Sequence, residues 1–418
     1  MKKLFLTMAS LVMLASMTFA QDETPMLPSQ HGLTDHQPAW GSSQEFNLAV
    51  GWNWWSTYLN GSTFTDLETV LEDDATQIKS SDPFVSYING TWQGTLSGTI
   101  QNDQMYSILM TSAKDISLRG SRADVANVEI SGGNSWNWVG YPVGTPMSIN
   151  YALQNYENPV DGDMFKGIDP FSVYDETNNV WVGTLNLLQP GAGYKMLSQK
   201  ESYSFHYPTD PDPSVTRYMI SQDATSTEWQ AVMASTPTNM NMIAVVNLND
   251  KELRSENVEI GVFNGEICRG AVHPMYVDFL DQYVVFLTMY GEENEPFSFR
   301  LLDNETGDIY ESNEASVSYK ADNIIGALRS PFELNFNTKN MVANHLHLFP
   351  NPVHHGEMVN MILPEGSVTV EVVNMLGSTV KSMRMTGSEL SADMAPGIYT
   401  VKVIDAEGKV YVDKLVVK

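Results

Sequence analysis

The sequence is poor in positive charge. Its 418 residues include 23 Lys and Arg against 50 Asp and Glu, which gives a formal net charge of −27. Nucleic-acid phosphates are bound by clustered cations and anionic lipid surfaces by basic patches, and the sequence contains no such cluster. The composition therefore argues against a nucleic-acid partner and against docking on a membrane through a basic surface.

Cysteine is nearly absent. Cys268 is the one thiol, so no disulfide can form within the chain, and core burial must stabilise an exported form. To act as a nucleophile, Cys268 would need a histidine partner, and His273 is near in sequence. The pattern of Ile260, Val262 and Ile267 predicts strands here, which favours a half-buried structural cysteine.

Long hydrophobic runs are also lacking, except at the start of the chain. Lys2 and Lys3 precede an apolar stretch over residues 4–17. The small residues Thr18 and Ala20 then lie at the −3 and −1 positions of a cleavage site before Gln21. This pattern is typical of a secretory signal peptide over residues 1–20, because the run is shorter than the ~20 apolar residues that a membrane span needs. We expect an exported chain with no transmembrane segment.

The chain does contain an internal repeat. With 42% hydrophobic residues it can fill several cores. Similar blocks occur twice in the same order, which indicates a tandem duplication. Gly51–Trp54 recurs as Ser135–Trp138, Asp82–Phe84 as Asp169–Phe171, and Trp92–Leu96 as Trp181–Leu185.

Each repeat is expected to begin with a Trp-rich strand and to continue with a short helix and three further strands. The helices are predicted over residues 67–71 and 149–153. The sequence thus predicts a mostly β chain of tandem β-rich modules, a third β-sandwich-like module and a C-terminal Ig-like β-sandwich. The predicted boundaries are 41–125 and 126–207 for the Trp-rich repeats, 208–226 for a Pro/Asp-rich linker, 227–336 for the third module, 337–345 for a second linker and 346–418 for the C-terminal domain.

The tryptophans allow two interpretations. Alternation places Trp52 and Trp54 on one face of a strand, and it does the same for Trp136 and Trp138. A matched pair is either a core signature or a platform on which sugar rings stack, which is the ligand-binding hypothesis. Trp55 has no aromatic counterpart in the second repeat, so we expect Trp55 to be the exposed indole of this candidate site.

Acidic loops offer a second candidate site. Asp161, Asp163 and Asp169 place carboxylates at short spacing. Calcium takes about six to eight oxygen ligands and is common outside cells. The segment lacks the full Asp-x-Asp-x-Asp-Gly loop with its distal Glu. We therefore expect no cofactor, with structural calcium at these three residues as the alternative.

The C-terminal stretch carries ordered motifs. Val368–Val372 and Tyr399–Val403 alternate apolar and polar residues, as half-buried strands do. Short motifs lie before, between and after these strands. Their residues are Pro350, Asn351, Pro352, Asn374, Leu376, Gly377, Gly397, Tyr399, Lys414, Leu415, Val416, Val417 and Lys418.

These motifs resemble the C-terminal sorting domain, type A, of the type IX (Por) secretion system, over residues 346–418. The resemblance implies an export route. Such cargo crosses the inner membrane by its signal peptide and the outer membrane through the type IX machinery. The cargo is then released or attached to surface lipopolysaccharide. The Trp-rich blocks loosely resemble repeat modules of surface proteins that the same system exports.

Catalytic motifs are lacking as well. The sequence has no Gly-x-Ser-x-Gly, His-Glu-x-x-His or phosphate-binding Gly-rich loop, and His206 and His273 are the only histidines in residues 41–336. We expect a non-enzymatic adhesin that binds a glycan or a host surface protein. A secreted glycosidase-like hydrolase stays open, because any two of the 50 acids could converge. A purely structural component of the surface or matrix also stays open.

Overall fold

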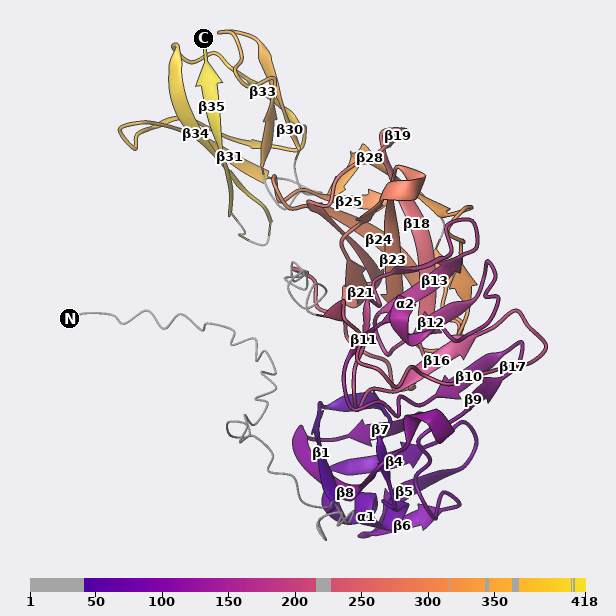
Figure 1. Ribbon diagram of the computed structural model, residues 1–418. Coiled ribbons are helices and arrows are strands. Elements are labelled where there is room, and N and C mark those ends of the chain that lie inside the picture. Colours follow the sequence, from indigo (N-terminus) through magenta and orange to yellow (C-terminus); the bar gives the residue numbers. More distant parts are fainter. Residues whose placement is uncertain are drawn as a thin grey trace, which may run out of the picture. The chain divides into compact units, whose positions relative to one another are not determined.

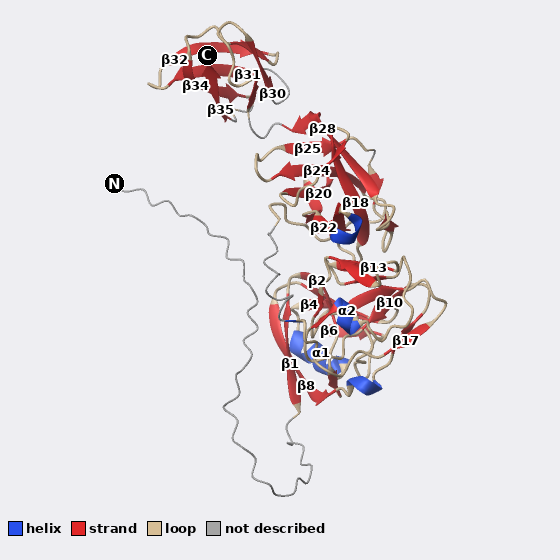
Figure 2. Cartoon of the chain, turned by 45° about the horizontal axis from the view of Figure 1, so that its top comes forward, coloured by secondary structure: helices blue, strands red, loops and turns tan. Residues whose placement is uncertain are grey.

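The computed structural model describes residues 41–215, 227–314, 316–342, 346–362, 368–406, 408 and 410–418. The predicted signal peptide lies outside these residues. Strands dominate and helices are few and short (Figures 1 and 2), so the predicted mostly β fold class is confirmed. Within the described ranges, no helix combines the length and apolarity that crossing a membrane requires.

The first repeat holds two sheets around one core. A five-stranded sheet has the order β2-β7-β4-β5-β6, and a three-stranded sheet has the order β1-β8-β3. Trp55 and Ile78 from the first sheet share a core with Phe46 and Leu118 from the second. The elements are β1 (Ser42–Leu48), β2 (Gly51–Trp55), β3 (Leu59–Asn60), α1 (Phe64–Leu71), β4 (Ala75–Lys79), β5 (Phe84–Ile88), β6 (Thr91–Gly94), β7 (Tyr106–Met110) and β8 (Lys114–Arg122).

Helix α1 begins at a capping box, in which Thr63 and Asp66 each bond the other's backbone N–H. Its apolar side, with Leu67 and Leu71, is buried in the core. The predicted helix over residues 67–71 is thus confirmed and begins one turn earlier.

The second repeat is built in the same way around its own core. Its five-stranded sheet has the order β10-β16-β12-β13-β14, flanked by two-stranded sheets β11-β15 and β17-β9. Helix α2 confirms the second predicted helix and ends at Ala152. The elements are η1 (Val125–Asn127), β9 (Ile130–Gly132), β10 (Trp136–Val139), β11 (Met147–Ser148), α2 (Ile149–Ala152), β12 (Met164–Lys166), β13 (Phe171–Asp175), β14 (Val180–Gly183), β15 (Leu187–Leu188), β16 (Tyr194–Leu197) and β17 (Tyr203–Phe205).

The two five-stranded sheets have one strand order: the first strand lies beside the last, followed by the second, third and fourth along the chain. The second strands, β4 and β12, are additional to the predicted elements. A shared strand order supports the proposal that the two repeats are a tandem duplication.

A glycine ends the fourth strand of both sheets. Gly94 has φ +156° and Gly183 has φ +153°. A Cβ on Gly94 would lie 2.2 Å from the Phe84 carbonyl oxygen, and one on Gly183 would lie 2.3 Å from that of Phe171. Only glycine permits this φ together with such a close backbone approach, which explains why the Trp-x-Gly block occurs twice.

The third module has a continuous sheet path, β21-β20-β24-β25-β28-β18-β23-β22. The long strand β28 pairs with β18 through its first half and with β25 through its second half. Strands on both sides of β28 therefore contribute to one core. The elements are β18 (Met240–Leu248), β19 (Lys251–Glu252), β20 (Val258–Asn264), β21 (Ile267–Val272), β22 (Met275–Val277), η2 (Asp278–Leu280), β23 (Gln282–Met289), β24 (Pro296–Asp303), β25 (Ile309–Ser312), β26 (Val317–Ser318), β27 (Ile324–Ile325) and β28 (Phe332–Val342).

The C-terminal domain is a small sandwich of a three-stranded sheet, β29-β30-β33, and a four-stranded sheet, β32-β31-β34-β35. The alternating valines of β31 and β34 point into its core. The elements are β29 (His347–Phe349), β30 (Met358–Ile362), β31 (Val368–Asn374), β32 (Thr379–Met385), β33 (Glu389–Ser391), β34 (Gly397–Ile404) and β35 (Val410–Val417).

Both predicted linkers differ in part from expectation. Asp212, in the first, is buried and accepts hydrogen bonds from the backbone N–H and hydroxyl of Ser148. The first part of this segment is thus attached to the second repeat, and residues 216–226 lie outside the described residues. The predicted second linker is strand up to Val342, because Met341 and Val342 pair with Tyr310 and Ile309 of β25 beyond a register shift.

The close approach at Gly183 can be tested with Gly183→Ala. We expect the free energy of unfolding to fall by about 3 kcal/mol, from the disfavoured φ and the overlap with the Phe171 carbonyl. Urea unfolding of the chain without its predicted signal peptide, residues 21–418 (the mature chain below), measures this. Gly387→Ala is the control, because nothing lies within 4 Å of its added Cβ. Equal stability of the two variants would contradict the explanation.

Candidate functional site

Each five-stranded sheet has two faces with different roles. In the first repeat, Trp55, Ile78 and Val85 point into the repeat's own core. The strand register places Trp52 and Trp54 on the opposite face, together with Lys79 and Phe84. We call this second face the outer face. The outer face of the second repeat carries the matched pair Trp136 and Trp138, as alternation predicted.

The outer-face tryptophans contact the third module. The indole N–H of Trp52 donates to the Ser235 carbonyl at 2.7 Å, and that of Trp54 donates to the Pro237 carbonyl at 2.9 Å. Trp136 likewise donates to the Asp322 carbonyl at 2.9 Å. Backbone carbonyls therefore take up the polar edge of each indole, which favours packing over a ligand platform for these residues.

Trp55 is a correction to the sequence analysis. It was expected to be the exposed indole, yet it is 2% exposed. Its ring packs 5.5 Å from Phe46 and 5.5 Å from Tyr106, measured between ring centroids. The missing aromatic counterpart in the second repeat was misleading, because Val139 occupies an equivalent core position there.

Two buried lysines meet a single carboxylate where the second repeat contacts the third module. Lys166 Nζ lies 2.9 Å from Asp322 Oδ1, and Lys195 Nζ lies 2.9 Å from both Asp322 oxygens. Both lysine side chains are almost fully buried, while Asp322 is 25% exposed. Lys166, Lys195 and Asp322 are referred to below as the Asp322 cluster.

Aromatic rings close the cluster on one side. Lys166 Nζ lies 4.0 Å from the Trp136 ring centroid, and Lys195 Nζ lies 5.0 Å from that of Trp54 and 5.4 Å from that of Trp138. These are cation–π distances, so the rings help to hold the amines where water is excluded. Trp54, Trp136 and Trp138 thus line a charged contact between modules.

Burial and mutual repulsion set the protonation of the cluster. Burial lowers the pKa of Lys166 to about 7; Asp322 opposes this shift, and Lys195 adds to it. Burial also lowers the pKa of Lys195. Burial alone would raise the pKa of Asp322, but the two lysines outweigh it and hold that pKa below its usual range. One carboxylate cannot balance two ammonium groups, so the cluster favours one neutral amine.

These lysines were not among the predicted site residues. Lys166 follows two apolar residues in Met164–Lys166, and Lys195 lies between apolar residues in Tyr194–Leu197. A lysine inside an otherwise apolar strand is a usable indicator of a buried, paired charge. The partner Asp322 lies far away in sequence, and no local pattern connects it to either lysine.

The three aspartates of the calcium alternative lie in separate environments. Asp163 is buried and accepts from Tyr156 Oη and from the Gln199 backbone N–H. Asp161 accepts from a backbone N–H, and Asp169 accepts from the Tyr290 hydroxyl. Across the described part of the chain, no three His, Cys, Asp or Glu side chains are grouped so that they could hold a metal ion.

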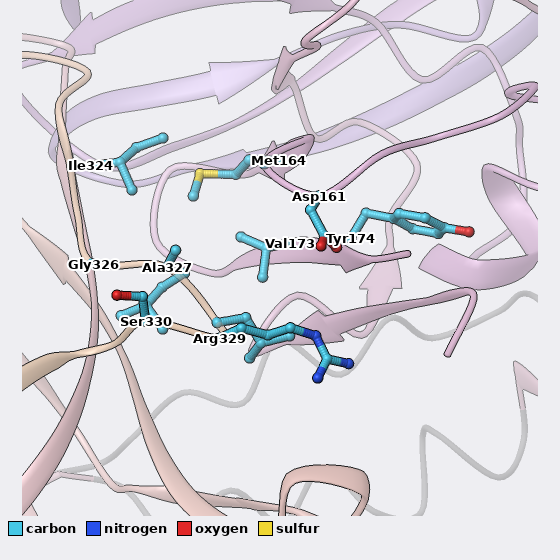
Figure 3. A pocket seen from close by; sticks show the side chains of 12 residues that line it. Asp161, Met164, Val173, Tyr174, Ile324, Gly326, Ala327, Arg329 and Ser330 are labelled. Carbon is cyan, nitrogen blue, oxygen red and sulfur yellow. The ribbon is translucent and has the colours of Figure 1, made fainter. Parts of the chain in front are cut away.

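A small apolar pocket is lined by residues of the second repeat and the third module. Figure 3 shows Met164, Val173 and Ile324 around it, with Arg329 at its edge. Its volume is about 210 Å³, below the ~300 Å³ at which small-molecule sites commonly begin. Arg329 is held by an ion pair with the buried Asp175 at 2.7 Å. The pocket therefore offers little room and no free cation to a ligand.

Cys268 is a buried structural residue. Its thiol donates to the Gly270 carbonyl at 3.5 Å, and burial raises the pKa of the thiol. The His273 ring contacts the Val258 carbonyl through Nδ1. The two side chains thus have separate partners, and the thiol is in the protonated form that suits packing.

In the C-terminal domain, motif residues from both ends meet at one sheet edge. Asn351 Nδ2 donates to the Lys414 carbonyl at 2.5 Å, and Asn351 Oδ1 accepts from the Val416 backbone N–H at 3.0 Å. Val353 adds backbone bonds to the end of the same strand. Strand β35 is the edge of its sheet, so these contacts cover backbone groups that would otherwise be open to pairing with another chain.

The remaining motif residues shape a turn and a strand. Asn374 Oδ1 accepts from the backbone N–H groups of Leu376 and Ser378 and closes the turn between β31 and β32. Gly377 has φ +80°, which favours glycine. Leu376 is 90% exposed. Tyr399, a residue of β34, is buried and its hydroxyl donates to the Ala395 carbonyl.

Residues 347–418 match the family described as a secretion system C-terminal sorting domain. The chain therefore carries a type IX sorting domain, as its motifs predicted, and is exported across the outer membrane to the cell surface or the extracellular space. The domain also implies an interaction with the secretion machinery. A search of curated proteins finds no match for the chain.

Two solved structures from Porphyromonas gingivalis are weakly similar. One is PorZ, described as an essential bacterial surface component of the type-IX secretion system, with 13% identity and a TM-score of 0.16 over 82% of this chain and 51% of PorZ. The other is dimeric latent PorU, with 10% identity and a TM-score of 0.18 over 83% of this chain and 30% of PorU. The chain thus spans about half of the first and a third of the second, and TM-scores this low transfer neither fold nor role.

The Asp322 cluster can be tested with Asp322→Asn. We expect the free energy of unfolding to fall by about 3–5 kcal/mol, because the buried, charged amine of the cluster loses its anion. Urea unfolding of the mature chain measures the change. Glu266→Gln is the control in the same module, since it breaks an ion pair to Arg300 in which Glu266 is 88% exposed and should cost less than about 1 kcal/mol. Equal losses would contradict a buried cluster.

The edge contact in the sorting domain can be tested with Asn351→Ala. We expect this domain to lose about 1–3 kcal/mol, because two backbone groups of β35 lose their partner. Export should fall with it, measured as the fraction of the chain outside the outer membrane. Asn360→Ala removes a single long bond of 3.4 Å to the Phe349 carbonyl and should leave both readings unchanged. Normal export of Asn351→Ala would count against the role of this contact.

Proposed function

We propose that this chain is an exported, non-enzymatic binding protein and that the outer face of its first repeat holds a protein partner. The sorting domain supplies the address, and the repeats and third module supply a firmly joined cargo. The proposal rests on one comparison between the two repeats. Around the third strand of the sheet, the same face is covered in one of them and open in the other.

The comparison is clearest at the third strands of the two sheets. Phe171 is 0% exposed and packs on Phe286 of the third module, with ring centroids 5.7 Å apart. Its counterpart Phe84, from the same Asp-Pro-Phe block, is 45% exposed, and Ile88 on the same face is 46% exposed. A face that is built to dock in one copy and lies open in the other supports a docking role.

Polar groups on the open face favour a protein sheet as the occupant. Gln93 and Gln77 flank Ser86 across the neighbouring strands and supply amide donors and acceptors. Lys79 occupies the register position that Lys166 has in the second repeat. A partner surface with apolar residues around one acidic side chain would repeat the contact that Asp322 makes. The open face also continues the contact made by Trp52 and Trp54 with the third module.

The proposal predicts that binding depends on Phe84 and Ile88. The mature chain, residues 21–418, should bind selectively on an array of host surface proteins and glycans, with calcium and with chelator. Phe84→Ser combined with Ile88→Ser should weaken protein binding at least about tenfold, since central apolar contacts carry most binding energy. Ile267→Ser, equally exposed at 46% in the third module, should bind as the parent does.

Other outcomes separate the alternatives. Selective binding to glycans alone would replace the protein partner with a sugar ligand. A well-folded chain that binds nothing would contradict the adhesin proposal and leave the hydrolase and structural alternatives. Loss of binding in the presence of chelator would indicate that binding needs a cation, with the acidic loops as its candidate site.

A further inference from the structure

The Asp322 cluster brings an amine and an amide into contact. Lys166 Nζ lies 2.7 Å from Asn239 Oδ1, 2.9 Å from Asp322 Oδ1 and 3.1 Å from Asn241 Oδ1. Lys166 belongs to β12 of the second repeat, and Asn239 directly precedes β18 of the third module. A nucleophile, an electrophile and a carboxylate are therefore held together between two modules.

Lys166 has the environment of a reactive amine. Lys195 is bonded to both oxygens of Asp322, so a protonated Lys195 already balances that carboxylate. A second proton on Lys166 would add an unpaired buried charge, which burial disfavours although the Trp136 ring attracts it. An amine that is neutral near physiological pH is the nucleophilic form of lysine.

Asn239 is a fixed electrophile. Its side chain is almost fully buried, and its Nδ2 donates to the Ile168 carbonyl at 2.7 Å. Its backbone carbonyl accepts from the N–H of Asp322. The amide therefore cannot turn away from Lys166. Fixing two reactants at contact distance replaces a bimolecular step by an effectively intramolecular one and can compensate for the low reactivity of an amide.

We propose that Lys166 and Asn239 become joined by an isopeptide bond. The neutral Nζ attacks Cγ of Asn239, and a new Nζ–Cγ bond forms. Asp322 accepts the proton that Nζ loses and returns it to the leaving Nδ2. The Cγ–Nδ2 bond breaks, and ammonia leaves. The carbonyl oxygen stays on Cγ, nothing is oxidised or reduced, and no further reactant is needed.

The bond would fasten two modules of a chain that has no disulfide. Lys166 and Asn239 are 73 positions apart in sequence, so the link would close a long loop and restrict the unfolded chain, as a disulfide does. It would also convert the more deeply buried amine of the cluster into a neutral amide and leave Asp322 paired with Lys195. The cluster would then carry one positive and one negative charge.

Mass spectrometry of the purified mature chain tests the proposal. We expect an intact mass lower by one ammonia, about 17 Da, than the sequence requires. Cyclisation of Gln21 and succinimide formation at Asn264-Gly265 release ammonia as well, so the site must be located by tryptic mapping. The expected product is a branched peptide pair that joins Lys166 to Asn239. Cleavage at Arg217 under denaturing conditions should leave the two halves of the chain joined.

Variants give a matched comparison. Lys166→Arg and Asn239→Ala should abolish the branched peptide, and Asp322→Asn should reduce it severalfold. Lys79→Arg changes the equivalent lysine of the first repeat and should leave the branched peptide at its normal yield. If a variant does not fold, the map of the unaltered chain decides alone. Recovery of the Lys166 and Asn239 peptides as separate species, with no branched pair, would overturn the proposal, as would a link to Asn241 or to Asp322.

Discussion

The cargo depends on one constraint: a single carboxylate pairs with two lysine amines that are buried away from water. Asp322 comes from the third module, while Lys166 and Lys195 come from neighbouring strands of the second repeat. Separating the modules would leave the amines in an apolar surface without their anion. Removing one partner of a buried ion pair costs far more free energy than the intact pair contributes to stability. The Trp136 indole bonds the backbone of the same aspartate, so the aromatic contacts depend on the position of Asp322 as well.

Local periodicity predicted much of the fold and little of the site. The helices, the Trp-bearing strands and the alternating strands of the sorting domain follow from patterns of two or four residues. Local patterns do not show whether the outer face of a sheet is covered by another module. That depends on contacts between residues more than a hundred positions apart, such as Lys166 and Asp322. The predicted strand β13 is buried at all five positions, and without alternation its residue pattern does not distinguish the face that packs on the third module.

The proposed duplication placed one sheet in two environments. In both copies the inner face fills a core, and the same glycine approaches the same carbonyl. The outer faces diverge: Lys195 in the second copy corresponds to Ser107 in the first, and Phe171 is covered where Phe84 is open. Changes at a few outer positions, with the inner face kept, are enough to turn a structural contact into a surface available to another molecule.

The contact between Asn351 and β35 has a consequence for incomplete molecules. The asparagine is made early in the sorting domain, but the two backbone groups that it bonds belong to Lys414 and Val416, 63 and 65 positions later. A polypeptide that stops short of these residues lacks the edge strand and leaves Asn351 without its partners. Such a fragment contains most of the cargo but only an incomplete sorting domain. The order of the contacts therefore delays completion of this sheet edge until the strand that carries Lys414 and Val416 has been made.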